Sequence, residues 1–136
     1  MTAGYSGTPL PKKLGIKEGS RVALIGAPSG FDRTLGELPA RVKVTSRASG
    51  EADVIVLFSV EFRKLQKDFV KAMAMMPSDG GMLWVAWPKK ASRVQTDLDE
   101  NLIRDFGLAQ GVVDTKVCAI DATWSGLRFS RRQSSG

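Results

Sequence analysis

Three short apolar runs constrain the fold of this chain more than any other feature of its sequence. They are RVALIG at 21–26, DVIVLF at 53–58 and MLWVAW at 82–87. Apolar runs of this length, bounded by glycines or polar residues, are typical of strands that are buried on both faces, as in a parallel sheet. We therefore expect three central strands that helices cover on either side.

Helical and hairpin patterns complete this core. In residues 61–76 the apolar side chains recur at steps of three and four, which places them on one face of a helix. Residues 112–120 and 124–130 read as two strands joined by a short link, which predicts a C-terminal antiparallel hairpin. Strands that alternate with helices indicate an α/β protein with a mostly parallel sheet. The apolar face of the helix consists of Phe62, Leu65, Phe69, Met73 and Met76.

Weaker signals predict four more elements and the residues that cap the helices. Short hydroxyl and carboxylate side chains accept hydrogen bonds from the free N–H groups at helix starts. On that basis Thr8 caps a first helix, Ser59 caps the helix over 61–76, and Thr96 or Asp97 caps the last one, which Gly107 closes. The four elements are helices over 8–14, 32–38 and 97–106 and a strand over 41–45.

One connection in this order is short. Only residues 46–52 separate the second strand from the third, whereas a helical crossover between parallel strands needs about a dozen residues. Either a helix and a strand of the full pattern are missing, or the connection is an extended crossover. We expect one domain over residues 8–130, a flexible N-terminus over 1–7 and a flexible polar tail over 131–136.

The scarcity of histidine and cysteine limits the chemistry. The chain has no histidine and a single cysteine, Cys118. This excludes catalytic triads with a histidine base, histidine-ligated zinc, intramolecular disulfides and multi-thiolate zinc sites. Because Cys118 lies in an apolar strand with no evident cationic neighbour, we interpret it as an inert core residue rather than a nucleophile.

The charge balance is basic but dispersed. Lysine and arginine number 20 against 14 aspartates and glutamates, a net charge of +6. No block of five consecutive like charges occurs, so a solvated surface explains the charge more simply than a nucleic-acid site. The first residues lack the apolar segment of a secretory signal, and no apolar run approaches the roughly 20 residues of a membrane span. We therefore expect a cytoplasmic protein that does not act at a membrane.

The loop after the first apolar run is the first candidate site, and we call it the Gly loop. Ligands of open α/β sheets bind beyond the carboxyl ends of the strands, where the strand order reverses. Backbone N–H groups at such a loop favour an anion, although a tight turn is the plainer interpretation. The dinucleotide and Walker A patterns both fail here, at Pro28 and Phe31. The Gly loop consists of Gly26, Ala27, Pro28, Ser29, Gly30 and Phe31.

Polar residues after the other two apolar runs extend this candidate surface. Ser59 follows the second run, and Lys89, Lys90 and Ser92 follow the third. The carboxyl ends of parallel strands lie on one edge of the sheet, so these residues are expected beside the Gly loop. Two lysines there are suited to a phosphate or a nucleic-acid backbone, with a solvated basic loop as the alternative.

The element order resembles the class I methyltransferase version of the Rossmann fold. The resemblance rests on the first strand with its glycine loop, on the Gly-Gly turn and strand of DGGMLWV at 79–85, and on the closing hairpin. It implies a Rossmann-like three-layer sandwich, trimmed by the short connection at 46–52. This likeness is architectural, and a fold alone does not assign an activity.

The ligand-binding positions of that family are only partly matched. Its loop pattern, acidic-x-G-x-G-x-G, is met at Gly26 and Gly30 but not at Leu24 or Pro28. An acidic residue grips the ribose after the second strand in the family, whereas this chain has Thr-Ser at 45–46. These departures argue against an ordinary cofactor site.

Three segments also resemble a family of small bacterial proteins described only as a domain of unknown function. They are GYSGTPLPKKLGI at 4–16, LWVAWPKKAS at 83–92 and DTKVCAIDATWSGLRF at 114–129. The resemblance implies a compact bacterial cytosolic protein and carries no activity or catalytic residue.

A site-shaped scaffold without catalytic groups predicts a non-catalytic module that binds a small anionic ligand or a protein partner. One alternative is an atypical methyltransferase-like protein that binds S-adenosylmethionine through backbone groups. Another is a nucleic-acid-binding module with a basic surface. We assign no catalytic residue and no metal ligand. The basic surface of the last alternative would comprise Lys64, Lys67, Lys71, Lys89, Lys90 and Arg93.

Overall fold

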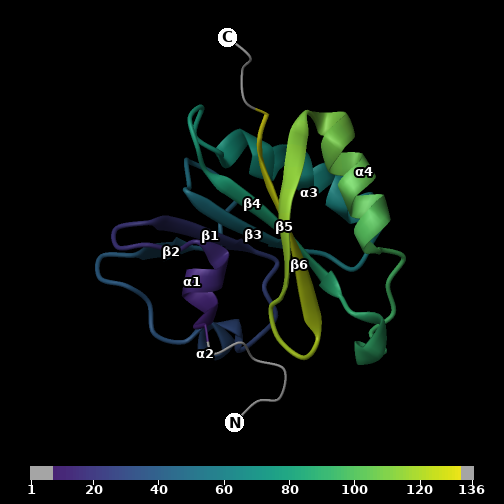
Figure 1. Cartoon of the computed structure of the whole chain (residues 1–136), viewed down its shortest axis with the longest axis horizontal. Helices are drawn as coiled ribbons and strands as arrows, with labels where there is room; N and C mark the ends of the chain where they lie inside the picture. Colours follow the sequence, from purple (N-terminus) through teal and green to yellow (C-terminus); the bar gives the residue numbers. More distant parts are fainter. Residues whose placement is uncertain (1–7, 133–136) are drawn as a thin grey trace.

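The fold is built on a six-stranded sheet with the order β2-β1-β3-β4-β6-β5 (Figure 1). The computed structural model describes residues 8–132. The strands are β1 (Arg21–Ile25), β2 (Lys43–Thr45), β3 (Val54–Phe58), β4 (Met82–Pro88), β5 (Val112–Ala119) and β6 (Trp124–Arg131). The helices are α1 (Leu10–Leu14), α2 (Phe31–Leu35), α3 (Phe62–Met75) and α4 (Glu100–Gln110), with a 3₁₀ turn η1 at Lys90–Ser92.

The first four strands are parallel, which confirms the interpretation of the apolar runs. β3 pairs with β1 on one side and with β4 on the other, and all five of its residues are buried. The chain places β2 on one side of β1 before it places β3 on the opposite side. The strand order therefore reverses between β1 and β3, as in Rossmann-like folds.

The C-terminal hairpin closes the sheet as predicted. β6 is antiparallel to β4, and β5 is antiparallel to β6. Asp121 forms the turn, because its Oδ1 accepts the backbone N–H groups of Thr123 and Trp124, both at 2.8 Å. The result is an α/β Rossmann-like sheet, mostly parallel, with antiparallel strands at its C-terminal side.

One face of the sheet is covered by α3 and α4, and we call it the α3/α4 face. The predicted apolar stripe of α3 packs there, with Leu65 and Phe69 fully buried. The ring of Phe69 contacts those of Phe106 in α4 and Phe129 in β6, with centroids 5.2 and 5.6 Å apart. Two amphipathic helices therefore bury this face along most of its length.

Within residues 8–132, the opposite face carries only α1 and α2, each of five residues, and we call it the α1/α2 face (Figure 1). Its core includes Leu14, Phe31, Leu35 and Trp84. The indole Nε1 of Trp84 donates to the backbone carbonyl of Leu14 at 3.0 Å, which ties α1 to the middle of the sheet. Trp84 and Trp87 belong to opposite faces, as their spacing on β4 predicts.

The short connection between β2 and β3 contains no helix, and residues 46–50 are exposed. It runs from the edge strand β2 across β1 to β3 as extended chain and turns. All three residues of β2 are also exposed. The extended crossover is therefore present, and β2 is an uncovered edge of the sheet.

Several predicted helix boundaries are wrong because tertiary contacts supply the caps. Ser59 does not cap α3, since its hydroxyl donates to the carbonyl of Glu61. The first N–H of α3 instead donates to Asp97 Oδ1, 35 residues further along the chain. α4 is capped by Asp99, which accepts from the Leu102 N–H at 2.8 Å, and not by Thr96 or Asp97.

The ends of the other helices also shift. Gly107 does not close the last helix: it lies buried inside α4, which runs on to Gln110 and ends at Gly111. α1 begins at Leu10 and its N-cap is Pro9, which we expected as the first helical residue, so Thr8 does not cap it. α2 covers Phe31–Leu35 rather than 32–38, because Gly36 leaves the helical conformation with φ of 78°.

Arg131 belongs to β6 and not to the polar tail in which we placed it. Its guanidinium donates to the carbonyls of Met73, Met76 and Pro77, at 2.8 to 3.3 Å, and so binds the C-terminal end of α3. The predictions for residues 1–7 and 133–136 lie outside the described residues. Within residues 8–132, no helix has the length and apolarity that crossing a membrane requires.

Candidate functional site

The carboxyl edge of the sheet carries the candidate site. The strand order reverses between β1 and β3, and ligands of open α/β sheets bind beyond the strand ends at such a point. The Gly loop leaves β1 there, and Ser59 follows β3 directly. The sequence therefore places its first candidate residues at the reversal point of the sheet.

Two glycines of the Gly loop are required by the backbone. Gly26 has φ of +72°, and a Cβ on it would lie 3.0 Å from the carbonyl oxygen of Phe58. Gly30 has φ of +83° as the N-cap of α2, and a Cβ on it would meet no atom beyond its chain neighbours within 4 Å. Left-handed φ values favour glycine at both positions. Gly26 thus permits close packing of β1 against β3, whereas Gly30 faces open space.

Aromatic side chains fill the crevice between the ends of β1 and β3 on the α1/α2 face. The rings of Phe31 and Phe58 lie 4.8 Å apart, and those of Phe58 and Trp124 lie 5.1 Å apart. Both phenylalanines are only 3% exposed. The place where a ligand would enter the reversal point on this face is therefore occupied by the protein's own side chains.

An open hollow lies on the other side of the Gly loop, between β1 and β2, and we call it the loop hollow. Its volume is about 440 Å³, within the usual range of about 300–1,000 Å³ for small-molecule sites. Its lining includes Leu24, Phe31 and Val44 as apolar groups and Asp32, Thr45 and Ser46 as polar ones. The Gly-loop residues at its wall are Gly26, Ala27, Pro28 and Gly30.

Asp32 lines this hollow and was not among the residues that the sequence suggested. It is exposed at the first turn of α2. An acid was expected only at the end of the second strand, where the structure has Thr45 with its Oγ1 accepting the N–H of Arg47. The sequence signal that could have identified Asp32 is its position two residues after Gly30. A short helix that starts at this glycine returns that position toward the Gly loop.

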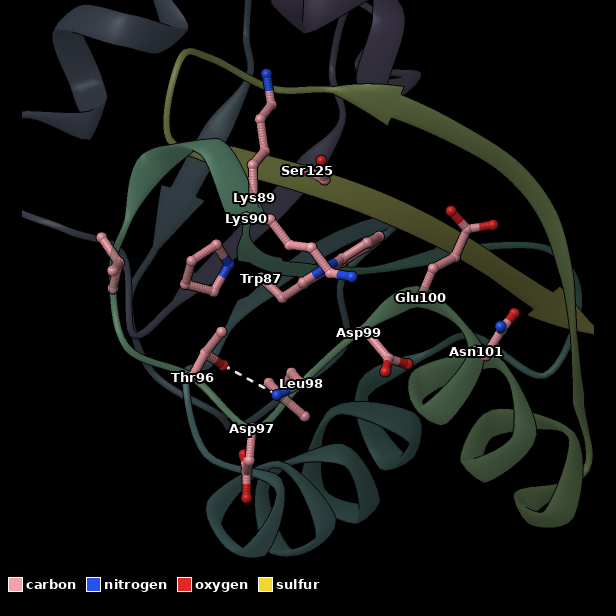
Figure 2. A pocket seen from close by; sticks show the side chains of 12 residues that line it. Trp87, Lys89, Lys90, Thr96, Asp97, Leu98, Asp99, Glu100, Asn101 and Ser125 are labelled. Atoms are coloured by element: carbon pink, nitrogen blue, oxygen red, sulfur yellow. Dashed lines mark hydrogen bonds between the residues drawn. The ribbon is translucent and has the colours of Figure 1, made fainter.

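A second, larger pocket opens beyond the end of β4, and we call it the β4 pocket (Figure 2). Its volume is about 690 Å³. Lys89 and Lys90 line it, together with acidic residues that begin α4. The full lining is Trp87, Pro88, Lys89, Lys90, Val94, Thr96, Asp97, Leu98, Asp99, Glu100, Asn101 and Ser125.

The predicted ligand surface is therefore divided rather than continuous. Five of the six Gly-loop residues line the loop hollow, whereas the two lysines line the β4 pocket, and no residue lines both. Ser29 lines neither. Ser59 is 5% exposed, and its hydroxyl donates to the Glu61 carbonyl. The Ser92 hydroxyl donates to the Lys89 carbonyl at 2.6 Å. Both serines therefore stabilise the local backbone.

The basic surface suggested for nucleic acid is interrupted by acids. Lys64 pairs with Asp68 at 2.8 Å on α3. Lys89 and Lys90 share the β4 pocket with Asp97, Asp99 and Glu100. A phosphate backbone is attracted to lysines but repelled by neighbouring carboxylates. This arrangement does not favour the nucleic-acid alternative, which stays a prediction.

The carboxylates around the sheet hold the backbone and other side chains. Asp97 and Asp99 cap α3 and α4, and Asp121 forms the hairpin turn. Asp53 lies at the opposite, amino edge of the sheet, where Arg21 binds it at 2.9 Å. Hydrogen bonds from Arg21 hold the pKa of the Asp53 carboxyl below its usual range, against a smaller opposing effect of burial.

Cys118 is half-buried on the α1/α2 face rather than enclosed. Burial raises the pKa of its thiol, although the charges of Lys13, Lys116 and Arg128 act in the opposite direction. The expectation that no cation lies near it is therefore wrong, since three do. Because burial has the larger effect, the thiol stays protonated at neutral pH, and its nucleophilicity is low.

The fold is similar to those of S-adenosylmethionine-dependent methyltransferases of known structure. One is a methyltransferase from Aquifex aeolicus, 15% identical over 89% of this chain and 87% of that chain, with a TM-score of 0.58. A magnesium protoporphyrin IX methyltransferase from Synechocystis PCC 6803 is 14% identical over 85% and 71% of the two chains, with a TM-score of 0.61. A ribosomal protein L11 methylase from Lactobacillus delbrueckii subsp. bulgaricus is 13% identical over 91% and 75%, also at 0.61.

These identities establish a shared fold and no shared activity. Neither a family model nor a curated protein matches the chain. The architectural resemblance to class I methyltransferases is therefore supported. The resemblance to a bacterial family of unknown function stays a prediction.

Proposed function

We propose that this chain is a methyltransferase-like ligand-binding domain that takes S-adenosylmethionine, or a related adenosyl ligand, in the loop hollow. The observation that carries the proposal is an open hollow beside the Gly loop, on a sheet that has the fold of S-adenosylmethionine-dependent methyltransferases. One of those neighbours was solved with S-adenosylmethionine bound. S-adenosylmethionine supplies an activated methyl group to the enzymes that use it.

The lining of the loop hollow fits the nucleoside part of such a ligand. Leu24 and Val44 offer apolar contact for a flat base. Asp32 and Ser46 offer a carboxylate and a hydroxyl that can accept hydrogen bonds from ribose hydroxyls. Asp32 thereby takes the part that an acid after the second strand would otherwise play.

The same structure limits what the domain does with the ligand. Phe31, Phe58 and Trp124 fill the crevice between β1 and β3, so the rest of the ligand extends along the open side of the Gly loop. The acids that the sequence places near the strand ends cap helices and turns. We therefore propose binding as the function of the loop hollow and assign no catalytic residue.

The test is a thermal-shift and calorimetric titration with S-adenosylmethionine, S-adenosylhomocysteine and adenosine. A ligand at a hundredfold its dissociation constant raises the free energy of unfolding by about 2.7 kcal/mol, which shifts the melting temperature by several degrees. Substituting Val44→Trp should fill the hollow and abolish the shift. Val44 is 46% exposed on an edge strand, so the change leaves the core intact.

Val117→Trp is the matched control. Val117 is also 46% exposed and also lies on an edge strand, β5, at the other side of the sheet. It should bind the adenosyl ligands as the unmodified chain does. The absence of a shift with all three ligands, or full binding by the Val44→Trp variant, would contradict the proposal.

A protein-binding role is the second candidate, and the exposed edge strand β2 favours it. Lys43, Val44 and Thr45 are all exposed, and the outer backbone groups of β2 pair with no strand in the described part of the chain. An extended segment of a partner can add to such an edge. The Lys43 N–H donates inward to the Ser20 carbonyl, so the next N–H, of Val44, faces outward, and Val44→Pro should weaken capture of such a partner without breaking the pairing of β2 with β1.

A further inference from the structure

The β4 pocket contains a hydrogen-bond donor that has no partner among the described residues. Trp87 is 7% exposed, and its indole N–H donates to no other described residue. No buried side-chain nitrogen or oxygen in residues 8–132 lacks a partner, so this N–H reaches the pocket surface. Trp84, three positions earlier, instead donates to the Leu14 carbonyl. The Trp87 N–H is therefore available to an acceptor atom in the pocket.

Opposite charges lie on separate parts of the pocket wall. Figure 2 shows the Lys90 side chain extending toward the middle of the pocket, whereas Lys89 and Asp97 point away from it. Lys90 makes no ion pair with the carboxylates of residues 8–132. Asp99 and Glu100 line the opposite wall, at the start of α4 (Figure 2). One side of the pocket is thus cationic and the other anionic.

The two carboxylates keep free acceptor capacity. Asp99 accepts the Leu102 N–H through Oδ1, and Glu100 binds Arg104 through Oε2. A carboxylate has about four lone-pair sites, so the second oxygen of each can bind an ammonium group in the pocket.

Part of the lining is apolar. The ring of Trp87, Pro88, Val94 and Leu98 form a hydrophobic wall, with Leu98 only 6% exposed. Such a wall suits an apolar body with few polar groups, the usual composition of a small-molecule site. The volume of about 690 Å³ accommodates one amino-acid-sized molecule.

The charge layout disfavours ligands that carry a single charge. A plain anion gains from Lys90 and the Trp87 N–H but is repelled by Asp99 and Glu100. A plain cation gains from the acids but is repelled by Lys90. A molecule that carries both charges can satisfy both sides at once.

We infer that the β4 pocket binds a small zwitterion of the α-amino-acid class with an apolar side chain. Its carboxylate lies on Lys90 and the Trp87 N–H, its ammonium on Asp99 and Glu100, and its side chain on the apolar wall. This site shares no residue with the loop hollow, so it is a second site and does not depend on the proposed function.

The first experiment compares three probes of similar size by calorimetry: L-phenylalanine, phenethylamine and 3-phenylpropionate. The first carries both charges, the second only the ammonium and the third only the carboxylate. We expect saturable binding of L-phenylalanine and binding about tenfold or more weaker for each of the others, the effect of losing one charge-assisted hydrogen bond. Equal binding of either single-charge probe, or no saturable binding of L-phenylalanine, would overturn the inference.

Single substitutions in the β4 pocket test where L-phenylalanine binds. Lys90→Gln should weaken L-phenylalanine and 3-phenylpropionate by about tenfold, and Lys89→Gln, whose side chain points away, serves as the control. Asp99→Asn should weaken L-phenylalanine and phenethylamine while α4 stays folded, because asparagine caps helices as well as aspartate does. Equal effects of Lys89→Gln and Lys90→Gln would contradict the assignment.

The two proposed sites can be separated in the same titrations. Val44→Trp in the loop hollow should leave L-phenylalanine binding unchanged, and Lys90→Gln should leave adenosine binding unchanged. If Lys90→Gln abolishes the adenosine signal, the adenosyl ligand binds in the β4 pocket, which would overturn its placement in the loop hollow.

Discussion

The two faces of the sheet are stabilised in different ways. The α3/α4 face is covered by helices of 14 and 11 residues. The ring of Phe69 on α3 packs against those of Phe106 on α4 and Phe129 on β6. The α1/α2 face is covered by two helices of five residues each. There a hydrogen bond from Trp84 and the packed rings of Phe31, Phe58 and Trp124 replace the long helices.

This difference shows where such a domain can place a binding site. Long amphipathic helices stabilise the face that they cover through the large apolar area that they bury. Isolated short helices, in contrast, do not persist without tertiary contacts. The α1/α2 face therefore depends on a few specific contacts, and its short helix α2 leaves the loop hollow open. We expect the α3/α4 face to hold most of the folding free energy and the α1/α2 face to be the adaptable one.

The largest expected effect contrasts two buried phenylalanines. Phe69→Ala on the α3/α4 face should lower the free energy of unfolding by about 3–5 kcal/mol, because it leaves a cavity between Phe106 and Phe129. Phe31→Ala on the α1/α2 face should cost at least about 1 kcal/mol less, because a five-residue helix can collapse into the space. Urea unfolding of both variants measures the difference, and equal losses would break the contrast.

Gly107 tests how closely α4 packs on the sheet. A Cβ at this position would collide with the ring of Phe129, so Gly107→Ala forces the helix away from β6. Overpacking of this kind costs about 1–3 kcal/mol, more than the roughly 1 kcal/mol that alanine gains over glycine in a helix. Thermal unfolding should show a lower melting temperature.

The neighbouring exposed residue serves as the control for that change. Leu108→Ala on the outer side of α4 should alter the free energy of unfolding by no more than about 0.5 kcal/mol. A stabilised Gly107→Ala variant would mean that the α3/α4 face is looser than its buried rings suggest.

The two tryptophans of β4 compare the faces within one strand. Trp84→Phe removes the hydrogen bond to the Leu14 carbonyl, which should cost about 1–2 kcal/mol including the lost volume. Trp87→Phe removes an N–H that has no partner in the described residues, so its cost should be smaller. Chemical denaturation of both variants tests the order, and a larger loss for Trp87→Phe would reverse it.

The smallest effect concerns a contact at the amino edge of the sheet, which belongs to neither face. The pKa of Asp53 is lowered by hydrogen bonds from Arg21, so its ionised form stabilises the fold. That contribution is present above the ordinary aspartate pKa of about 3.9 and is lost as the pH falls through the lower folded pKa. Asp53→Asn should therefore lower the melting temperature at pH 7 and have little effect near pH 2.

Asp105→Asn is the control for this pH dependence. Asp105 is exposed on α4 and makes no ion pair with the described residues. Its replacement should leave the melting temperature unchanged at both pH values. If Asp53→Asn lowers the melting temperature equally at both pH values, Asp53 contributes through its shape and not through its charge.

The α3/α4 face was largely predictable, and the α1/α2 face was not. The stripe of Leu65 and Phe69 follows the helical period, so local pattern and tertiary packing agree. The caps of α3 and α4 did not follow the pattern, because Asp97 reaches α3 from 35 residues away. The aromatic filling by Phe31, Phe58 and Trp124 joins three distant segments that no period connects.

The candidate site divides in the same way. The Gly loop and the lysines after β4 were identified from turn chemistry and from strand ends. Their separation into two pockets was not, because it depends on how far apart β2 and β4 lie across the sheet. Asp32 and the unpartnered Trp87 N–H became candidates only when the loop and β4 were seen in place.

The sequence by itself determined the α/β class, the parallel core, the closing hairpin and the limits that one cysteine and no histidine set on chemistry. These follow from periodicity, turn residues and composition, which act over a few neighbouring positions. The tertiary structure alone decided which donors stay unpaired, which acids are used as caps and which crevice is filled. Those outcomes depend on groups far apart in the chain, because a buried polar atom is satisfied by whatever the fold brings to it.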